Sequence, residues 1–327
     1  MAPFATAISG RLAIPHWHWL RAPIITPMTD KLPATFCFLN GAYTPLNEAK
    51  VSVMDRGFIF GDGIYEVVPV YRGKPFRFAQ HMARLARSLK ELRITNPLAS
   101  EQWRQVVDEL LLRYAKSSGL PSDQGDQLIY MQVTRGVAMR DHVMPTDLTP
   151  TVFAMVNTMR TPTAEQLVNG VACVTAEDFR WEKAHIKSTS LLGAVFARQL
   201  SFDAGALETV MFRDGFLSEA AASNVWVVKN GTVIGVPKDN LVLEGIRYGL
   251  IEDMCQSAGL PFELRRISRA EVLDADELLL SSATKEVLAI TTLDGRPVGH
   301  PSHSGRPGPV GARLLASYQV AKQAAAD

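Results

Sequence analysis

Strand patterns and helix patterns follow each other in an irregular order along this chain, and that order restricts the fold most. Residues 64–71 are rich in β-branched and aromatic side chains and are closed by Arg72-Gly73, which predicts a strand. Residues 78–93 place apolar side chains three and four positions apart, which predicts an amphipathic helix. We also predict strands at 36–39, 128–133, 151–156, 171–174, 209–212, near 262, at 278–281 and 287–292. Further helices are predicted at 102–116, 191–202, 245–258 and 309–322. Tight hairpins are predicted at Asn40-Gly41 and Asn230-Gly231. Because the order is not a regular βαβ alternation and no GxGxxG follows a strand, we expect a mixed α/β (α+β) fold rather than a Rossmann fold.

Two domains are expected from the length of 327 residues. The polar segment 158–165, which contains Pro162, is suited to a linker. We therefore predict a small α/β domain over 36–157 and a larger domain over 166–327.

The first 35 residues form no clear element. They contain four prolines before residue 30 and the cluster His16-Trp17-His18-Trp19, but neither the basic start nor the continuous apolar run of a signal peptide. We expect a poorly ordered tail over 1–35. Because Met28 stands just before the first strand, residues 1–27 could also reflect a start codon assigned too far upstream.

Composition excludes several classes of protein. The formal net charge is +1, without a basic stripe, so a nucleic-acid or membrane-surface partner is not expected. No apolar run approaches the roughly 20 residues of a membrane-spanning helix. The three cysteines, Cys37, Cys173 and Cys255, form no CxxC pair, so we expect buried free thiols in a cytoplasmic protein and no metal site.

Two ionisable residues stand in unusual surroundings. Lys187 precedes the apolar run 191–195, and Glu219 lies beside the small residues 220–223. Most lysines are solvated surface charges, and one glutamate next to alanines is unremarkable. A flat ring, however, could lie against such small residues, and a carboxylate beneath a pyridine nitrogen would keep that nitrogen protonated.

Two further features could bind an anion. Arg84 lies on the predicted helix 78–93, where the simplest interpretation is a solvated helix face and the alternative is a guanidinium bound to phosphate. Gly245-Ile246-Arg247 opens another predicted helix, whose free N–H groups would suit a negative charge.

Five stretches in the same order and spacing resemble the fold-type IV pyridoxal-phosphate enzymes. They are Asp55 to Val68, His81 to Leu85, Gln132 to Gly136, Ile186 to Ser188 and Glu219 to Asn224. The similarity covers about residues 36–323, and the chain most resembles the bacterial D-amino-acid aminotransferase branch. It implies a small N-terminal α/β domain, a larger C-terminal pseudo-barrel domain and pyridoxal 5'-phosphate as cofactor.

The resemblance also implies roles for single residues. Lys187 matches the lysine that forms the internal aldimine, and Glu219 matches the partner of the pyridine nitrogen. The phosphate would be bound by the Arg84 side chain, by the amides of Ile246 and Arg247, and by Thr284.

For the substrate, Tyr65, Arg140 and His142 resemble the family's carboxylate trap. The Arg-x-His pair is typical of the D-amino-acid branch and reaches into the neighbouring subunit's site, which implies a homodimer. An arginine can bind a carboxylate through two parallel hydrogen bonds. The implied function is ping-pong transamination between small D-amino acids and 2-keto acids, of the type D-alanine plus 2-oxoglutarate to pyruvate plus D-glutamate.

Alternatives remain within the same resemblance. A branched-chain L-aminotransferase or an (R)-amine transaminase would lack the Arg-x-His pair, and an aminodeoxychorismate lyase would release pyruvate without a keto-acid acceptor. A non-catalytic binding protein of the same fold is a remote alternative. Trp226, Ala222 and Ala283 depart from the family pattern and leave cofactor affinity open.

Overall fold

The computed structural model describes residues 32–119 and 125–326. The predicted tail over 1–35 therefore lies almost entirely outside the described residues. The described chain contains two β-sheets, one built before residue 159 and one after residue 170.

The first sheet has the strand order β2-β1-β6-β5-β3-β4 in the described part of the chain. All its neighbouring strands are antiparallel. The predicted Asn40-Gly41 hairpin is confirmed, since both residues have positive φ values of 48° and 92°, as a type I′ turn requires. The strands are β1 (Phe36–Leu39), β2 (Ala42–Pro45), β3 (Gly63–Tyr71), β4 (Lys74–Pro75), β5 (Gln127–Thr134) and β6 (Thr151–Thr158).

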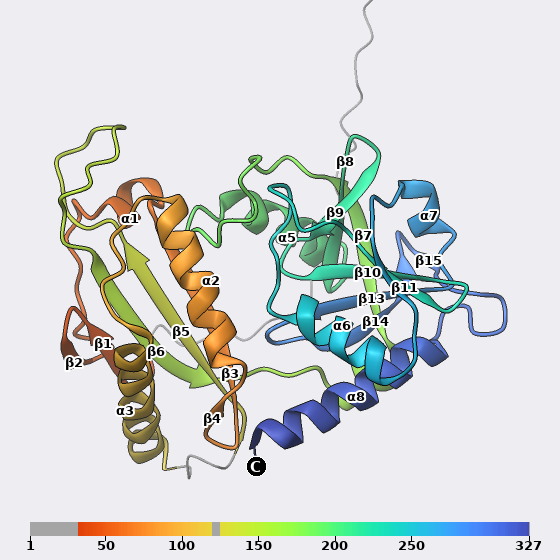
Figure 1. Cartoon of the computed structure of the whole chain (residues 1–327), viewed down its shortest axis with the longest axis horizontal. Helices are drawn as coiled ribbons and strands as arrows, with labels where there is room; N and C mark the ends of the chain where they lie inside the picture. The colour runs from red at the N-terminus through yellow and green to blue at the C-terminus, as the bar shows by residue number, and fades with distance from the viewer. Residues whose placement is uncertain (1–31, 120–124, 327) are drawn as a thin grey trace, which may run out of the picture. The chain divides into compact units, whose positions relative to one another are not determined.

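Helices α2 (Phe78–Glu91) and α3 (Ser100–Ser118) pack against this sheet and close its core (Figure 1). Met82, Leu85 and Leu89 of α2 are buried, so the predicted amphipathic face is confirmed. The short helix α1 (Arg56–Phe60) precedes β3 and is capped at its N-terminus by Asp55, whose side chain accepts a hydrogen bond from the Gly57 N–H.

The second sheet is mixed and curls on itself. Its order in the described residues is β12-β11-β10-β13-β14-β7-β8-β9, with β15 beside β14. Only residues 221–223 connect β9, at one end of this order, to β10, so the two distant parts of the sheet must approach each other. The predicted pseudo-barrel is thereby confirmed. The strands are β7 (Val171–Glu177), β8 (Glu208–Arg213), β9 (Phe216–Ala220), β10 (Asn224–Lys229), β11 (Thr232–Gly235), β12 (Phe262–Leu264), β13 (Glu277–Ser282), β14 (Glu286–Leu293) and β15 (Arg296–Pro297).

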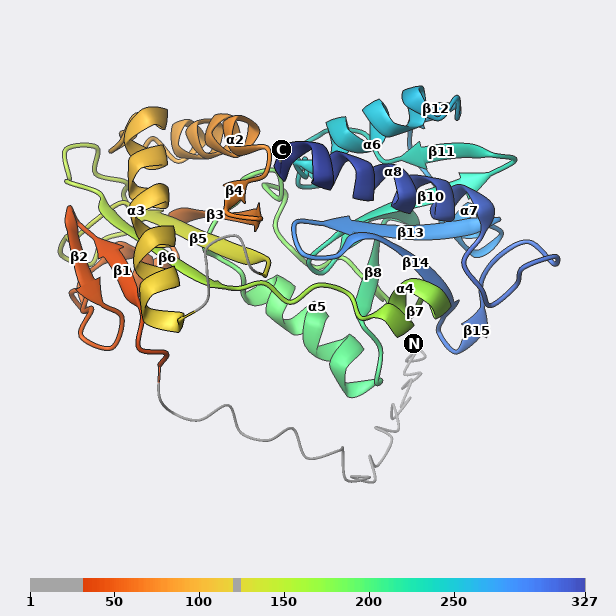
Figure 2. The ribbon, with the colours of Figure 1, turned by 90° about the horizontal axis from the view of Figure 1, so that it is seen from below.

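Helices α6 (Arg247–Ser257) and α8 (Pro309–Ala326) pack near strands β10, β13 and β14, as Figure 2 shows. The Tyr318 hydroxyl on α8 lies 3.0 Å from the Tyr71 hydroxyl at the end of β3, so α8 also contacts the first sheet. The remaining helices are α4 (Ala164–Asn169), α5 (Leu192–Asp203) and α7 (Arg269–Leu273).

The differences from the sequence predictions concern short elements. Helices α1, α4 and α7 have five or six residues, too few for a helical period to be visible. Strand β9 was missed because its Ser-Glu-Ala end carries no strand pattern. The predicted linker overlaps the last residue of β6 and the first two of α4, and the division into two domains stays a prediction.

The three cysteines are free and buried, as predicted. Among the described helices, none is long and apolar enough to cross a membrane.

Candidate active site

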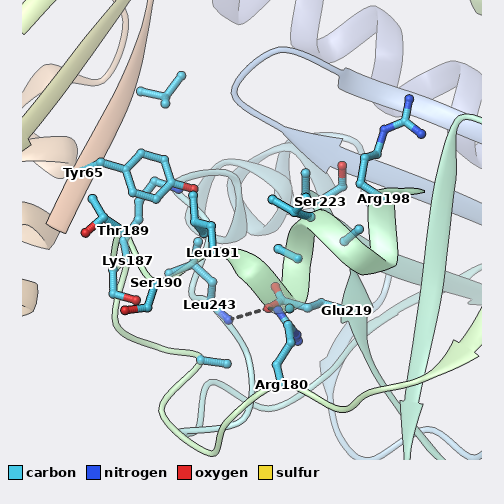
Figure 3. A pocket seen from close by; sticks show the side chains of 18 of the residues that line it. Tyr65, Arg180, Lys187, Thr189, Ser190, Leu191, Arg198, Glu219, Ser223 and Leu243 are labelled. Atoms are coloured by element: carbon cyan, nitrogen blue, oxygen red, sulfur yellow. Dashed lines mark hydrogen bonds and ion pairs between the residues drawn. The ribbon is translucent and has the colours of Figure 1, made fainter. Parts of the chain in front are cut away.

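A cavity of about 1160 Å³ lies between the two sheets. The first sheet and its helices contribute Tyr65 and Arg84, whereas Lys187, Glu219 and Arg247 come from the second half of the chain. Figure 3 shows Tyr65 and Lys187 on one side of this cavity and Glu219 on the other. Lys187 and Glu219 therefore face one site, although 32 positions separate them in the sequence.

The backbone around Lys187 is joined to β3. The Tyr65 N–H donates to the Lys187 carbonyl at 3.0 Å, and Ile64 forms an isolated bridge with Ser188. The Lys187 N–H donates to the Ser88 hydroxyl of α2 at 3.3 Å. The Lys187 Nζ then lies 4.1 Å from the centroid of the Tyr65 ring, within the range of a cation–π contact.

Glu219 extends from β9 and is only 4% exposed. Its carboxylate accepts hydrogen bonds from Arg180 Nη1 at 2.7 Å, from Asn224 Nδ2 at 3.1 Å and from the Leu243 N–H at 3.3 Å. Burial raises the pKa of the Glu219 carboxyl, and the Arg180 guanidinium offsets this effect only in part.

Arg180 is a cavity residue that the sequence reasoning missed. Its guanidinium binds Asp178 through two nitrogens, each at 2.9 Å, while its third nitrogen reaches Glu219. Arg213 also approaches Asp178, at 3.3 Å. The sequence signal for this ion pair is that Asp178 and Arg180 stand two positions apart just after a strand. The contact of Arg180 with Glu219 gives no such signal, because it spans 39 positions.

Arg84 is held by a buried carboxylate. Its Nε and Nη2 donate to the two oxygens of Glu66 at 2.7 and 2.8 Å, and its Nη1 donates to the Glu244 carbonyl at 3.1 Å. Burial opposes ionisation of Glu66, but Arg84 outweighs it and holds the pKa of Glu66 well below its usual range. His81 contacts the same carboxylate at 2.7 Å, and burial lowers the pKa of His81 to about 4.

The start of α6 faces the same end of the cavity. Ile246, Arg247 and Thr284 all line it, and the first N–H groups of a helix have no acceptor within the helix. The Arg247 side chain is 2% exposed, and its Nε and Nη1 have no hydrogen-bond partner among the described residues. Its guanidinium lies between the rings of Phe76 and Tyr318, 5.0 and 5.3 Å from their centroids.

Arg140 and His142 lie elsewhere. Both are exposed in the loop between β5 and β6, and neither is among the described residues that line this cavity. They do lie near one another, because the Arg140 guanidinium and the His142 ring both contact the Phe60 ring, at 5.4 and 5.6 Å between centres.

The three departures from the family pattern have different surroundings. Trp226 is a core residue whose indole N–H donates to the Ser281 hydroxyl at 2.9 Å, and it is not among the described cavity residues. Ala222 and Ala283 do line the cavity. The Ala222 N–H donates to Glu208 at 3.1 Å, and the Ala283 carbonyl accepts from Arg247 at 3.3 Å.

Comparisons with known proteins agree with this geometry. The profile of the amino-transferase class IV family matches residues 63–293. The D-alanine aminotransferase of Bacillus licheniformis is 36% identical over 281 residues, which are 86% of this chain and 94% of that protein. The D-alanine aminotransferase of Staphylococcus haemolyticus is also 36% identical, over 87% of this chain and 96% of that protein.

Two solved structures illustrate the shared fold. The branched-chain aminotransferase of the archaeon Thermoproteus uzoniensis superposes with a TM-score of 0.76 at 21% identity, covering 88% of this chain and 95% of that chain. A fold IV transaminase from Curtobacterium pusillum gives a TM-score of 0.71 at 26% identity, covering 84% of this chain and 93% of that chain.

A deep cavity between two sheets, with a lysine amine and a buried carboxylate facing it, defines an enzyme site of the aminotransferase type. The chain belongs to the amino-transferase class IV family, since the family profile and relatives of more than 30% identity both cover most of its length. The fold-type IV architecture predicted from the motifs is confirmed.

Replacement of Arg180 should expose its electrostatic role. Arg180→Met removes the cation that offsets burial of Glu219, so the pKa of Glu219 should rise further. When folding raises the pKa of a carboxyl, the folded protein loses stability as the pH rises. The loss runs from the usual pKa of the carboxyl, 4.5 for Glu219, through the raised pKa. The deficit in unfolding free energy against the wild type should therefore grow between pH 4.5 and 8, toward the roughly 3–5 kcal/mol of a broken buried pair.

Denaturant unfolding at several pH values measures this deficit. Arg213→Met is the matched control, because Arg213 contacts Asp178 and not Glu219. A deficit that stays constant across this pH range would show that Arg180 does not stabilise an ionised Glu219.

Proposed function

We propose that the protein is a D-amino-acid transaminase that moves the amino group of small D-amino acids to 2-keto acids with pyridoxal 5'-phosphate as cofactor. The observation that carries the proposal is that Lys187 and the buried Glu219 face one cavity. The relatives named D-alanine aminotransferases, each matched over more than nine-tenths of its own length, support the substrate class.

The cavity fits the cofactor at three points. The Lys187 amine suits the aldehyde, and Glu219 suits a protonated ring nitrogen. The dianionic phosphate suits the end of the cavity that is formed by the first turn of α6, Arg84 and Arg247. Two nitrogens of the Arg247 guanidinium have no hydrogen-bond partner among the described residues. When bound, pyridoxal phosphate supplies the aldehyde that takes up the substrate amine and the ring that accepts electron density from the broken C–H bond.

The protein's own residues then position charges and move a proton. Lys187 is the general acid/base that carries the substrate α-proton, an effect worth about 10²–10⁴-fold in rate. Arg180 favours the ionised form of Glu219, and an ionised Glu219 can hold a positive charge on the ring nitrogen. Water enters and supplies the carbonyl oxygen of the keto acid that leaves, and a second keto acid then takes up the amino group by the reverse of these steps.

The substrate carboxylate would be bound by Tyr65 from the same chain and by Arg140 and His142 from a second copy. Tyr65 lines the cavity, whereas the Arg140–His142 loop projects from its own chain. A homodimer is supported by exposed apolar side chains at the cavity rim and on α5, namely Phe179, Trp181, Leu192, Val195 and Phe196.

A cytoplasmic location is part of the proposal. Burial raises the pKa of Cys173 to about 12 and of Cys255 to about 11, so these thiols stay protonated at neutral pH. Three buried free thiols are typical of a reducing compartment. We also retain a small domain over 36–157 and a large cofactor-binding domain over 166–327.

A half-reaction tests the function directly. The cofactor-loaded protein is mixed with D-alanine, L-alanine or L-leucine, and the conversion of the cofactor from its aldehyde form to its amine form is followed by absorbance. We expect rapid conversion by D-alanine only. Conversion by L-leucine instead would indicate a branched-chain L-aminotransferase, and conversion by none would remove the assignment as an amino-acid transaminase.

Arg140→Ala tests the carboxylate trap. Loss of a bidentate contact to a charged group, worth about 1.5–3 kcal/mol, should weaken binding of D-alanine roughly 10–100-fold. Ethylamine, which is D-alanine without its carboxylate, should react at an unchanged rate. Comparable losses for both compounds would show that Arg140 does not bind the carboxylate.

A further inference from the structure

A buried triad of charges lies outside the cavity. Asp62, between α1 and β3, accepts a hydrogen bond at 2.8 Å from the Nε of Arg56 and another at 2.8 Å from the Nε of Arg135, with a third from Arg135 Nη2 at 3.0 Å. The three side chains are 4%, 8% and 2% exposed for Arg56, Asp62 and Arg135. None of the three is among the described residues that line the cavity.

Both arginines extend from the triad to the backbone of one loop. Arg56 Nη1 donates to the Asp141 carbonyl at 2.6 Å, and Arg135 Nη1 donates to the Pro145 carbonyl at 3.2 Å. Arg135 also donates to the Leu92 carbonyl at 2.6 Å, just after α2. The short segment 141–145 is thus held at both ends by guanidinium groups that share one carboxylate.

The base of this loop is closed independently. Gly136 has a φ of +101°, and a Cβ there would lie 2.1 Å from the Thr149 carbonyl oxygen, so the two ends of the loop are in contact. The Arg56 N–H donates to the Gly136 carbonyl at 2.9 Å, which joins the loop base to the start of α1.

Phe60 connects the triad to the exposed side chains of the loop. Its ring centroid lies 4.7 Å from the Arg56 guanidinium and 5.4 Å from the Arg140 guanidinium. The His142 ring lies 5.6 Å from the same centroid. One phenyl ring therefore separates a fixed buried arginine from the two residues at the loop tip.

We propose that Asp62, with Arg56 and Arg135, is a positioning residue that fixes the loop 137–149 so that Arg140 and His142 present a preformed carboxylate-binding pair. The inference rests on the proposed function, because it concerns the same carboxylate trap. Neutralising Asp62 releases both guanidinium groups at once, and the loop then loses the fixed backbone contacts at Asp141 and Pro145.

The ionised state of Asp62 is consistent with this role. Burial opposes its ionisation, but the two arginines hold the pKa of Asp62 below its usual range. Asn at this position keeps the size of the side chain and can accept fewer hydrogen bonds from guanidinium groups.

The test uses the cofactor-loaded Asp62→Asn protein. Hydrogen–deuterium exchange should increase in a peptide covering 137–149, and the KM for D-alanine should rise roughly tenfold, as for loss of one charged hydrogen bond. The kcat, the cofactor absorbance and the half-reaction with ethylamine should stay within about twofold of the wild type, since Asp62 does not face the cavity. Asp126→Asn is the matched control, because it breaks the ion pair with Lys322 at 2.7 Å without touching the loop.

The outcomes separate this inference from the function on which it rests. Unchanged exchange and unchanged KM in Asp62→Asn, with a raised KM in Arg140→Ala, would overturn the positioning role and leave the trap intact. Increased hydrogen–deuterium exchange of the loop in Asp62→Asn, with an unchanged KM in both Asp62→Asn and Arg140→Ala, would show that Arg140 does not bind the substrate carboxylate. That result would also overturn the role proposed for the triad. If Asp62→Asn does not fold, Arg56→Lys serves for the same readouts, since it weakens the contact to Asp141 and keeps the charge.

Discussion

The whole site depends on a few backbone hydrogen bonds between β3 and residues 187–189. The Tyr65 N–H donates to the Lys187 carbonyl at 3.0 Å, and the Thr189 N–H donates to the Gly63 carbonyl at 2.9 Å. These bonds attach a segment from the second half of the chain to the edge of the first sheet. They fix the Lys187 amine beside the Tyr65 ring and thereby set the distance to Glu219 on the far wall. The amine therefore lies in a segment attached to the first sheet and the carboxylate lies on the second sheet, so relative movement of the sheets would separate them.

Four of the buried carboxylates around the two sheets are paired with arginine. Glu219, Asp178, Glu66 and Asp62 each contact at least one arginine, which offsets the cost of burying the carboxylate. Arg247 differs from those arginines, because at the start of α6 it has aromatic neighbours and no carboxylate partner among the described residues. An uncompensated positive charge beside a helix start favours a bound anion, which is why this end of the cavity suits the cofactor phosphate.

The sequence predicted those features that depend on local pattern. Long strands and helices, the Asn-Gly turns and the buried cysteines are confirmed, because side-chain period and turn chemistry are local. The motifs also brought together Tyr65, Arg84, Lys187, Glu219, Ile246, Arg247 and Thr284 at one cavity. Arg180 and the Asp62 triad were not predicted, since each includes contacts that span 39 to 85 positions. Trp226 was considered in relation to the cofactor, but the structure places its indole in the core, where only tertiary packing could have shown it.

The central claim is that one lysine, Lys187, carries the cofactor. Borohydride reduction of the cofactor-loaded protein, followed by proteolysis and mass spectrometry, locates the attachment directly. The account predicts a phosphopyridoxyl group on the peptide that contains Lys187 and on no other lysine. A label on a different lysine, or a reduced protein that loses the cofactor on denaturation, would contradict it.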